Sequence, residues 1–159
     1  MYMATYNGSK GIVALKEKIA LKSKLLVGES VEKITITLVD DSPLGAPYYQ
    51  SKQGLVVNDV GDFKNSWSVG LGSIDPTVRP ADTEGTAAVV DAIVKGKLYN
   101  LQDEVYITNS KEYAQMVEEG WEDNPDYGWK AKGGYHVVGN NTGTAVAILE
   151  AVAQKVSKM

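Results

Sequence analysis

The sequence predicts an α+β fold: a small, mostly antiparallel sheet packed against an N-terminal helix, a central helix and a C-terminal helix, with long loops. Apolar residues recur at helical spacing at both ends of the chain, and β-branched residues cluster in short segments between turn-rich stretches. With 159 residues, 43% of them hydrophobic, the chain is long enough to bury one core. We therefore expect a single structural domain over residues 1–159, with residues 1–8 flexible.

The first predicted helix covers residues 9–27. Four apolar residues form its main stripe: Ile12, Leu15, Ile19 and Leu26. Leu21 and Leu25 fall on the far side of the helix. A helix with a second apolar face often packs against a second partner, and another subunit is one such partner.

Residues 31–40 give conflicting signals. Ile34, Ile36 and Leu38 alternate with threonines, a pattern that favours a strand. The segment also stands directly before Asp-Asp-Ser-Pro, a position where helices often end. Taken on its residue pattern alone, this segment is predicted as a strand.

Residues 41–62 are rich in turn formers and predict a long loop, which within one domain is usually functional or disordered. Phe63 then leads into a strand with two different faces. The apolar face is predicted to enter the core and the other to stay polar. The two sets are Trp67, Val69 and Leu71 on the core face, and Ser66, Ser68 and Gly70 on the polar face.

A second loop, residues 73–83, leads to the central helix over residues 86–94. Asp82 or Thr83 is placed to cap this helix, because their side-chain oxygens accept hydrogen bonds from the first backbone N–H groups. Gly96 is predicted to end it.

The next strand begins at Val105, with Val105 and Ile107 pointing to one side. Asn109 and Ser110 turn the chain and are placed to cap a short helix. Gly120 is placed to end that helix, and residues 121–134 are expected to form an irregular hairpin or loop. The inward residues of the helix are Tyr113, Met116 and Val117.

The end of the chain predicts a short strand at residues 135–139 and a helix over residues 142–159. The helical spacing there is regular. Its apolar residues are Ala145, Ile148, Leu149, Val152 and Val156.

Charge is unevenly distributed along the chain, although the formal net charge is only -4. Residues 1–28 contain five Lys and one Glu, whereas residues 101–126 contain eight acidic residues and one Lys. This asymmetry allows the basic end of one copy to meet the acidic middle of the next, and a solvated helix face explains the lysines equally well. Five lysines without arginine are a weak nucleic-acid footprint.

The composition excludes several classes of site. The chain has no cysteine, which removes disulfides and thiolate chemistry, and no apolar run long enough to cross a membrane. His136 is the single histidine and stands between apolar residues, without a partner for a triad or metal site. The acidic residues between 118 and 126 do not match a calcium loop. We expect no enzymatic activity, no catalytic or metal site, and no cofactor.

Two segments carry a resemblance to a known family. DVGDFKNSW, residues 59–67, and VYITNSKEYAQMVEEG, residues 105–120, are similar in spacing and order to the blocks of the tailed-bacteriophage neck and tail-completion proteins, the group that includes minor tail protein Z. The family usually has Pro and Thr where this chain has Asn58 and Val60. The motif residues are Asp59, Gly61, Phe63, Trp67, Tyr106, Asn109, Tyr113, Glu118, Gly120 and Trp121.

The resemblance implies a structural virion protein rather than an enzyme. It implies a ring of this chain, a hexamer in the family, that completes or terminates the tail or joins it to the head. Its partners are then the tail tube or head connector proteins, with non-specific contact to DNA in the lumen, and its place is the virion after synthesis in the host cytoplasm. The corresponding family segment also makes residues 31–40 the end of a long helix, which we adopt.

Individual motif residues have a structural interpretation as well. Trp67 is expected in the core, while Tyr113 and Trp121 suit a core or a subunit seam because they bury a ring and keep a polar tip. Glu118 is expected in solvent or at the seam. The loops at 41–62, 73–83 and 121–134 are the expected contacts with other rings or with the lumen.

A monomeric binding module is the alternative. It would use exposed loop aromatics as platforms for a peptide or a sugar. Unchanged tyrosine and tryptophan fluorescence over a ligand panel would count against it. The loop aromatics are Tyr48, Tyr49, Tyr127 and Trp129.

Overall fold

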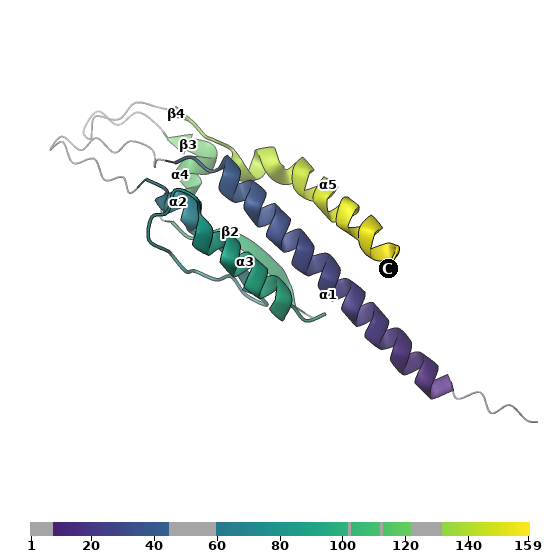
Figure 1. Cartoon of the computed structure of the whole chain (residues 1–159). Helices are drawn as coiled ribbons and strands as arrows, with labels where there is room; N and C mark the ends of the chain where they lie inside the picture. The colour runs from purple at the N-terminus through teal and green to yellow at the C-terminus, as the bar shows by residue number, and fades with distance from the viewer. Residues whose placement is uncertain (1–7, 45–59, 102, 112, 122–131) are drawn as a thin grey trace, which may run out of the picture.

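The structure, a computed structural model, describes residues 8–44, 60–101, 103–111, 113–121 and 132–159. It is α+β, as predicted, and Figure 1 shows the arrangement of its elements. In chain order the elements are α1 (Gly8–Asp41), α2 (Asp62–Asn65), β1 (Trp67–Leu71), α3 (Thr86–Leu98), β2 (Val105–Asn109), α4 (Ala114–Glu119), β3 (Gly120–Trp121), β4 (Lys132–Gly133) and α5 (Val137–Ser157).

Helix α1 is the axis of the molecule. At 34 residues it is about 50 Å long, because an α-helix rises 1.5 Å per residue. Helix α5 packs along one side of it, and α3 with the β1–β2 sheet packs on the other (Figure 1). The N-terminal part of α1 runs past the ends of both α3 and α5, whereas α4, β3 and β4 lie at the opposite end of the molecule.

Most of the buried apolar residues form two clusters along the C-terminal part of α1, and Val152 and Val156 of α5 are buried outside them. Burial of apolar surface here supplies the main driving force for folding. The larger cluster contains Leu38, Val39, Phe63, Trp67, Ala88, Val117 and Val137. The smaller cluster contains Val31, Val69 and Ala92.

Residues 31–40 are helical, so the strand predicted from their alternation alone is wrong and the helix adopted from the resemblance is confirmed. Thr35, Leu38 and Val39 are buried and share one face of α1, at helical rather than alternate spacing. Packing of this face against the core overrides the strand preference of the β-branched residues.

The main sheet is a two-stranded antiparallel ladder of β1 and β2, with Trp67 opposite Asn109 and Leu71 opposite Val105. Both strands were predicted. The second face of β1 carries polar side chains, as predicted, but Ser66 and Ser68 on it are fully buried beneath the segment that follows the strand. Both faces of β1 therefore belong to the interior.

Helix α3 runs two residues beyond Gly96, which does not end it. Gly96 lies instead against Gly28 of α1, where a Cβ on Gly96 would stand 2.9 Å from the Gly28 Cα. The two glycines allow the helices to approach closely. Asp82 serves the predicted capping role, since its carboxylate accepts hydrogen bonds from the N–H groups of Glu84 and Thr86.

The short helix α4 ends at Gly120, as predicted, where the backbone takes a φ of 93°. Strands β3 and β4 pair antiparallel on either side of residues 122–131, which lie outside the described residues. The strand predicted at residues 135–139 is wrong. Helix α5 begins at Val137, directly after His136 in a left-handed conformation, and Asn141 and Val137 face the interior from its first turns.

Within the described part of the chain, no helix combines the length and the apolar character needed to cross a membrane.

Candidate functional site

The two motif segments of the sequence meet in space. The Asn109 side-chain amide donates to the Phe63 carbonyl over 2.8 Å, and the Tyr113 hydroxyl donates to the Asp62 carboxylate over 3.0 Å. Lys111 forms an ion pair with the same Asp62. Residues more than forty positions apart are thereby tied together, and we call this group the motif cluster.

Aromatic rings fill the centre of the motif cluster. Phe63 meets Trp67 edge to face at 5.9 Å and lies 6.1 Å from the Tyr113 ring. The Trp67 indole N–H donates to the Ser42 hydroxyl at 2.8 Å, and Ser42 donates to the Leu38 carbonyl of α1. Trp67 is thus a core residue with its polar atom satisfied, as predicted, and Tyr113 is half-buried beside it.

Asn65 links the motif cluster to α3. It is 4% exposed, and its side-chain oxygen accepts from the N–H groups of Ala87 and Ala88 in the first turn of α3. Its amide donates to the Pro80 carbonyl at 2.8 Å. A cap supplied from twenty-two residues away leaves no local signal, so it was not predicted from the sequence.

Gly61 directly precedes the motif cluster and fixes the backbone conformation there. Its φ is 88°, and a Cβ there would overlap the backbone of Asp82 and Thr83. Its N–H donates to the Leu44 carbonyl at 2.7 Å. Only glycine combines this conformation with this close approach.

Glu118 has a role that differs from the expected solvent or seam position. Its two carboxylate oxygens accept from the N–H groups of Val138 and Gly139, at 3.0 and 2.9 Å, in the first turn of α5. The Glu118 carbonyl also accepts from the His136 N–H. A carboxylate at a helix N-terminus is favoured by both the free N–H groups and the helix dipole. Glu118 therefore docks α5 against α4.

Asn109 also has a local hydrogen bond, and the remaining motif residues that the structure describes lie apart from the motif cluster. The Asn109 carbonyl oxygen of the side chain accepts from the Lys111 N–H, which shapes the turn rather than capping α4 as predicted. The Tyr106 hydroxyl donates to Glu104, and this hydrogen bond raises the pKa of Tyr106. Trp121 pairs with Lys132 through the backbone. Asp59 and the Met116 side chain lie outside the described residues.

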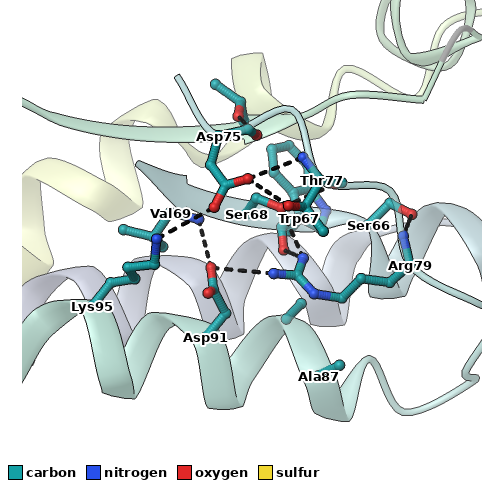
Figure 2. Close-up of polar contacts among 12 residues, drawn as sticks. Ser66, Trp67, Ser68, Val69, Asp75, Thr77, Arg79, Ala87, Asp91 and Lys95 are labelled. Carbon is teal, nitrogen blue, oxygen red and sulfur yellow. Dashed lines mark hydrogen bonds and ion pairs between the residues drawn. The ribbon is translucent and has the colours of Figure 1, made fainter. Parts of the chain in front are cut away.

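A second polar network, shown in Figure 2, closes the outer edge of β1. The Arg79 guanidinium donates to the Trp67 carbonyl at 2.7 Å and to the Ser68 hydroxyl at 2.8 Å. Asp91 of α3 accepts from the Val69 N–H at 2.8 Å and pairs with Arg79 at 3.3 Å. Side chains thus take the positions of a neighbouring strand, which removes β1 as an open edge.

Asp75 holds the segment after β1 to α3. Its carboxylate accepts from the Thr77 hydroxyl and the Thr77 N–H and pairs with Lys95 at 3.3 Å. The hydrogen bond from the Thr77 hydroxyl is the main cause that holds the pKa of Asp75 below its usual value, and Lys95 adds to it. The bonds favour the charged form of the carboxyl.

The side chains of these clusters are engaged in contacts within the fold. The polar side chains of the motif cluster cap helices or tie segments together. His136 is exposed at the start of α5, and the described ranges hold no group of three acidic or histidine side chains placed for a metal ion. The aromatics of the alternative binding module, Tyr48, Tyr49, Tyr127 and Trp129, lie outside the described residues.

The N-terminal half of α1 exposes several large apolar side chains. Ile12 and Leu15 are each 58% exposed and Ile19 is 52% exposed, although all three lie within a regular helix. Leu21 and Leu25, on the other side, are also exposed and line a groove of about 720 Å³ between α1 and α3. Within the described part of the chain, Ile12, Leu15 and Ile19 are thus left more than half uncovered.

A second groove lies between α1, β2 and α5. Its volume is about 300 Å³, and nearly all of its lining is apolar. Val146 and Leu149 on its α5 side are about half exposed. The apolar lining comprises Ile34, Leu38, Ile107, Val138, Ala145, Val146, Ile148 and Leu149.

The chain was compared with family models, with curated proteins and with solved structures, and none of the three comparisons gave a match.

Proposed function

We propose that this chain is a structural virion protein of a tailed phage, which completes or terminates the tail or joins tail to head by assembling into a ring. The two segments at residues 59–67 and 105–120 support the proposal, because they resemble the blocks of neck and tail-completion proteins in spacing and order. Their contact with each other fits segments that act together in building a fold.

The N-terminal half of α1 carries the proposal. Ile12, Leu15 and Ile19 are each more than half exposed and together form an apolar surface at the start of α1. Soluble monomers rarely leave such contiguous apolar patches in water, and patches of this kind mark interaction sites. A protein whose work is assembly needs such a surface, whereas an enzyme acting alone does not.

The ring would contain six copies, as in the family that the chain resembles. Its flat faces would meet the tail tube or the head connector, and its lumen would surround DNA. The acidic segment at residues 101–126 would face the lumen, where it would repel the DNA backbone and let it slide. A ring structure with residues 118–126 on the outside would remove this lumen assignment.

The test is the mass of the purified protein by light scattering over a concentration series, with electron microscopy of any large species. A discrete closed ring is the expected result, since head-to-tail interfaces generate rings when the rotation closes. The protein is then mixed with capsids and tails from an infection that lacks it. Restoration of complete particles supports the neck or tail role, and a protein that neither restores particles nor joins them overturns it.

A further inference from the structure

The exposed residues at the start of α1 continue the line along which α5 already packs. Helix α5 touches α1 through Lys22, Glu29 and Asp41: Lys22 donates to the Ser157 carbonyl, Lys155 pairs with Glu29, and Asn141 donates to Asp41. Successive steps of three or four residues along α1 lead from Asp41 back through Glu29 and Lys22. The next steps on this face are Ile19, Leu15 and Ile12.

The start of this face of α1 is uncovered because α5 does not extend beyond Lys22. Ser157 is the last residue of α5, and it lies opposite Lys22. Beyond that point Ile12, Leu15 and Ile19 have no covering helix among the described residues. We call these three residues the apolar stripe.

The charges beside the apolar stripe restrict what covers it. On a helical wheel Lys16 flanks it on one side and Lys18 and Lys22 on the other, while Glu17 lies opposite. Two copies packed stripe on stripe would bring these lysines together, and like charges repel. The partner surface must therefore differ from the stripe, being apolar along its length and acidic at its margin.

The groove between α1, β2 and α5 has these properties. Its lining is apolar, and two of its residues contact carboxylates at one end: Asn141 bonds Asp41, and Val138 bonds Glu118. The groove is also long enough to hold the stripe. The stripe spans about 10 Å and the α5 wall of the groove, from Val138 to Leu149, about 16 Å at the rise of an α-helix.

We infer that the apolar stripe of one copy docks in the groove between α1, β2 and α5 of the next copy, head to tail. This inference rests on the proposed function and specifies the seam of its ring. The stripe and the groove lie toward opposite ends of α1, so each copy offers one of each to different neighbours. Such a heterologous contact does not stop at a dimer, and it generates a ring when the rotation between neighbours closes.

The test uses two full-length variants, each blocked on one side of the seam. The stripe variant, Leu15→Glu with Ile19→Glu, places charged side chains in the apolar stripe. The groove variant, Val146→Lys with Leu149→Lys, places charged side chains in the apolar groove, and these charges also repel the lysines beside the stripe. All four positions are exposed, so circular dichroism and thermal unfolding are expected to match wild type. Each variant alone is expected to stay at the mass of one copy.

Mixing the two variants is the decisive measurement. The intact stripe of the groove variant meets the intact groove of the stripe variant, so a two-copy species is expected and nothing larger. The matched control, Val13→Glu with Leu21→Glu, changes two equally exposed residues of α1 away from the stripe and is expected to assemble like wild type.

Two outcomes overturn the seam. If wild type forms a ring but the mixed variants stay at one-copy mass, the seam lies elsewhere and the ring of the proposed function still stands. If wild type remains a single copy at every concentration, the seam is refuted. The proposed function is then decided separately by whether the wild-type protein restores complete particles.

Discussion

Single polar side chains hold the motif cluster together, and Asn65 is the most heavily used of them. It accepts two N–H groups of α3 and donates to Pro80 from a buried position. Asn65→Ala leaves these groups unpaired, and we expect a loss of about 2–3 kcal/mol in the free energy of unfolding by urea. Asn65→Asp keeps the acceptor and is expected to lose less. Equal stability of Asn65→Ala and wild type would contradict the capping role.

Thr35 is, in contrast to Asn65, a buried polar residue whose side chain lacks a hydrogen-bond partner among the described residues. This side chain is fully buried in α1. Thr35→Val replaces an unpaired hydroxyl with a methyl group of similar shape, so we expect a gain of about 1 kcal/mol in unfolding free energy. Thr37→Val is the control, because that hydroxyl donates to the Lys33 carbonyl. A loss of stability in Thr35→Val would show that its hydroxyl is bonded.

At the scale of elements, the sequence predicted those whose signal is local. The strand at Val105 alternates over residues that do form β2, and Gly120 ends α4 because it supplies the positive φ. The pattern of residues 31–40 predicted the wrong element. Their apolar residues alternate as in a strand, while their burial follows the period of a helix. Tertiary packing decides such segments, and it is not visible in ten residues.

The candidate site shows the same division. Trp67 and Tyr113 were recognised from the sequence because aromatic residues stand out within short motifs. The capping roles of Asn65 and Glu118 and the Arg79 network were missed. Their partners lie eleven to twenty-three residues away, so only the folded chain brings them together.

The segment after β1 supplies a prediction about pH. The pKa of Asp75 is lowered by the Thr77 hydroxyl, then by the Thr77 N–H and Lys95, so the folded state favours the carboxylate. Its stabilising contribution is full above the usual Asp pKa of about 3.9 and is lost as the pH falls through the lowered folded-state value. Asp75→Asn is therefore expected to be less stable than wild type at neutral pH, with the gap closing in acid.

Urea unfolding over a pH series measures this gap. Thr77→Val is the companion variant, because it removes the main cause of the shift and is expected to flatten the acid dependence in the same direction. Some acid dependence remains in both variants. The pKa values of Glu29 and Asp82 are also lowered, by a hydrogen bond from Lys155 and by the Glu84 N–H. A gap that stays constant with pH would contradict the role of Asp75.

At the scale of the whole molecule, α1 has two parts with different tasks. Its C-terminal part carries the core, beginning at Ser30 and Val31, while its N-terminal part exposes apolar side chains beside lysines. Of the acidic segment at residues 101–126, α4 and β3 lie at the other end of the molecule (Figure 1), whereas Leu101 lies beside Ala20 and Leu21 of α1. The N-terminal part of α1 therefore exposes an apolar and basic surface that folding does not require and that head-to-tail association uses.

Removal of residues 1–20 separates these two tasks. The deletion spares Lys22 with its bond to Ser157, and it removes side chains that contribute little to either buried cluster. We expect the free energy of unfolding to change by less than about 1 kcal/mol, or about 2–4 °C in Tm, while assembly into rings is lost. Removal of residues 1–7 alone keeps the whole of α1 and is the control, expected to assemble. Thermal unfolding and light scattering measure the two effects, and rings formed without residues 1–20 would show that the start of α1 is not the seam.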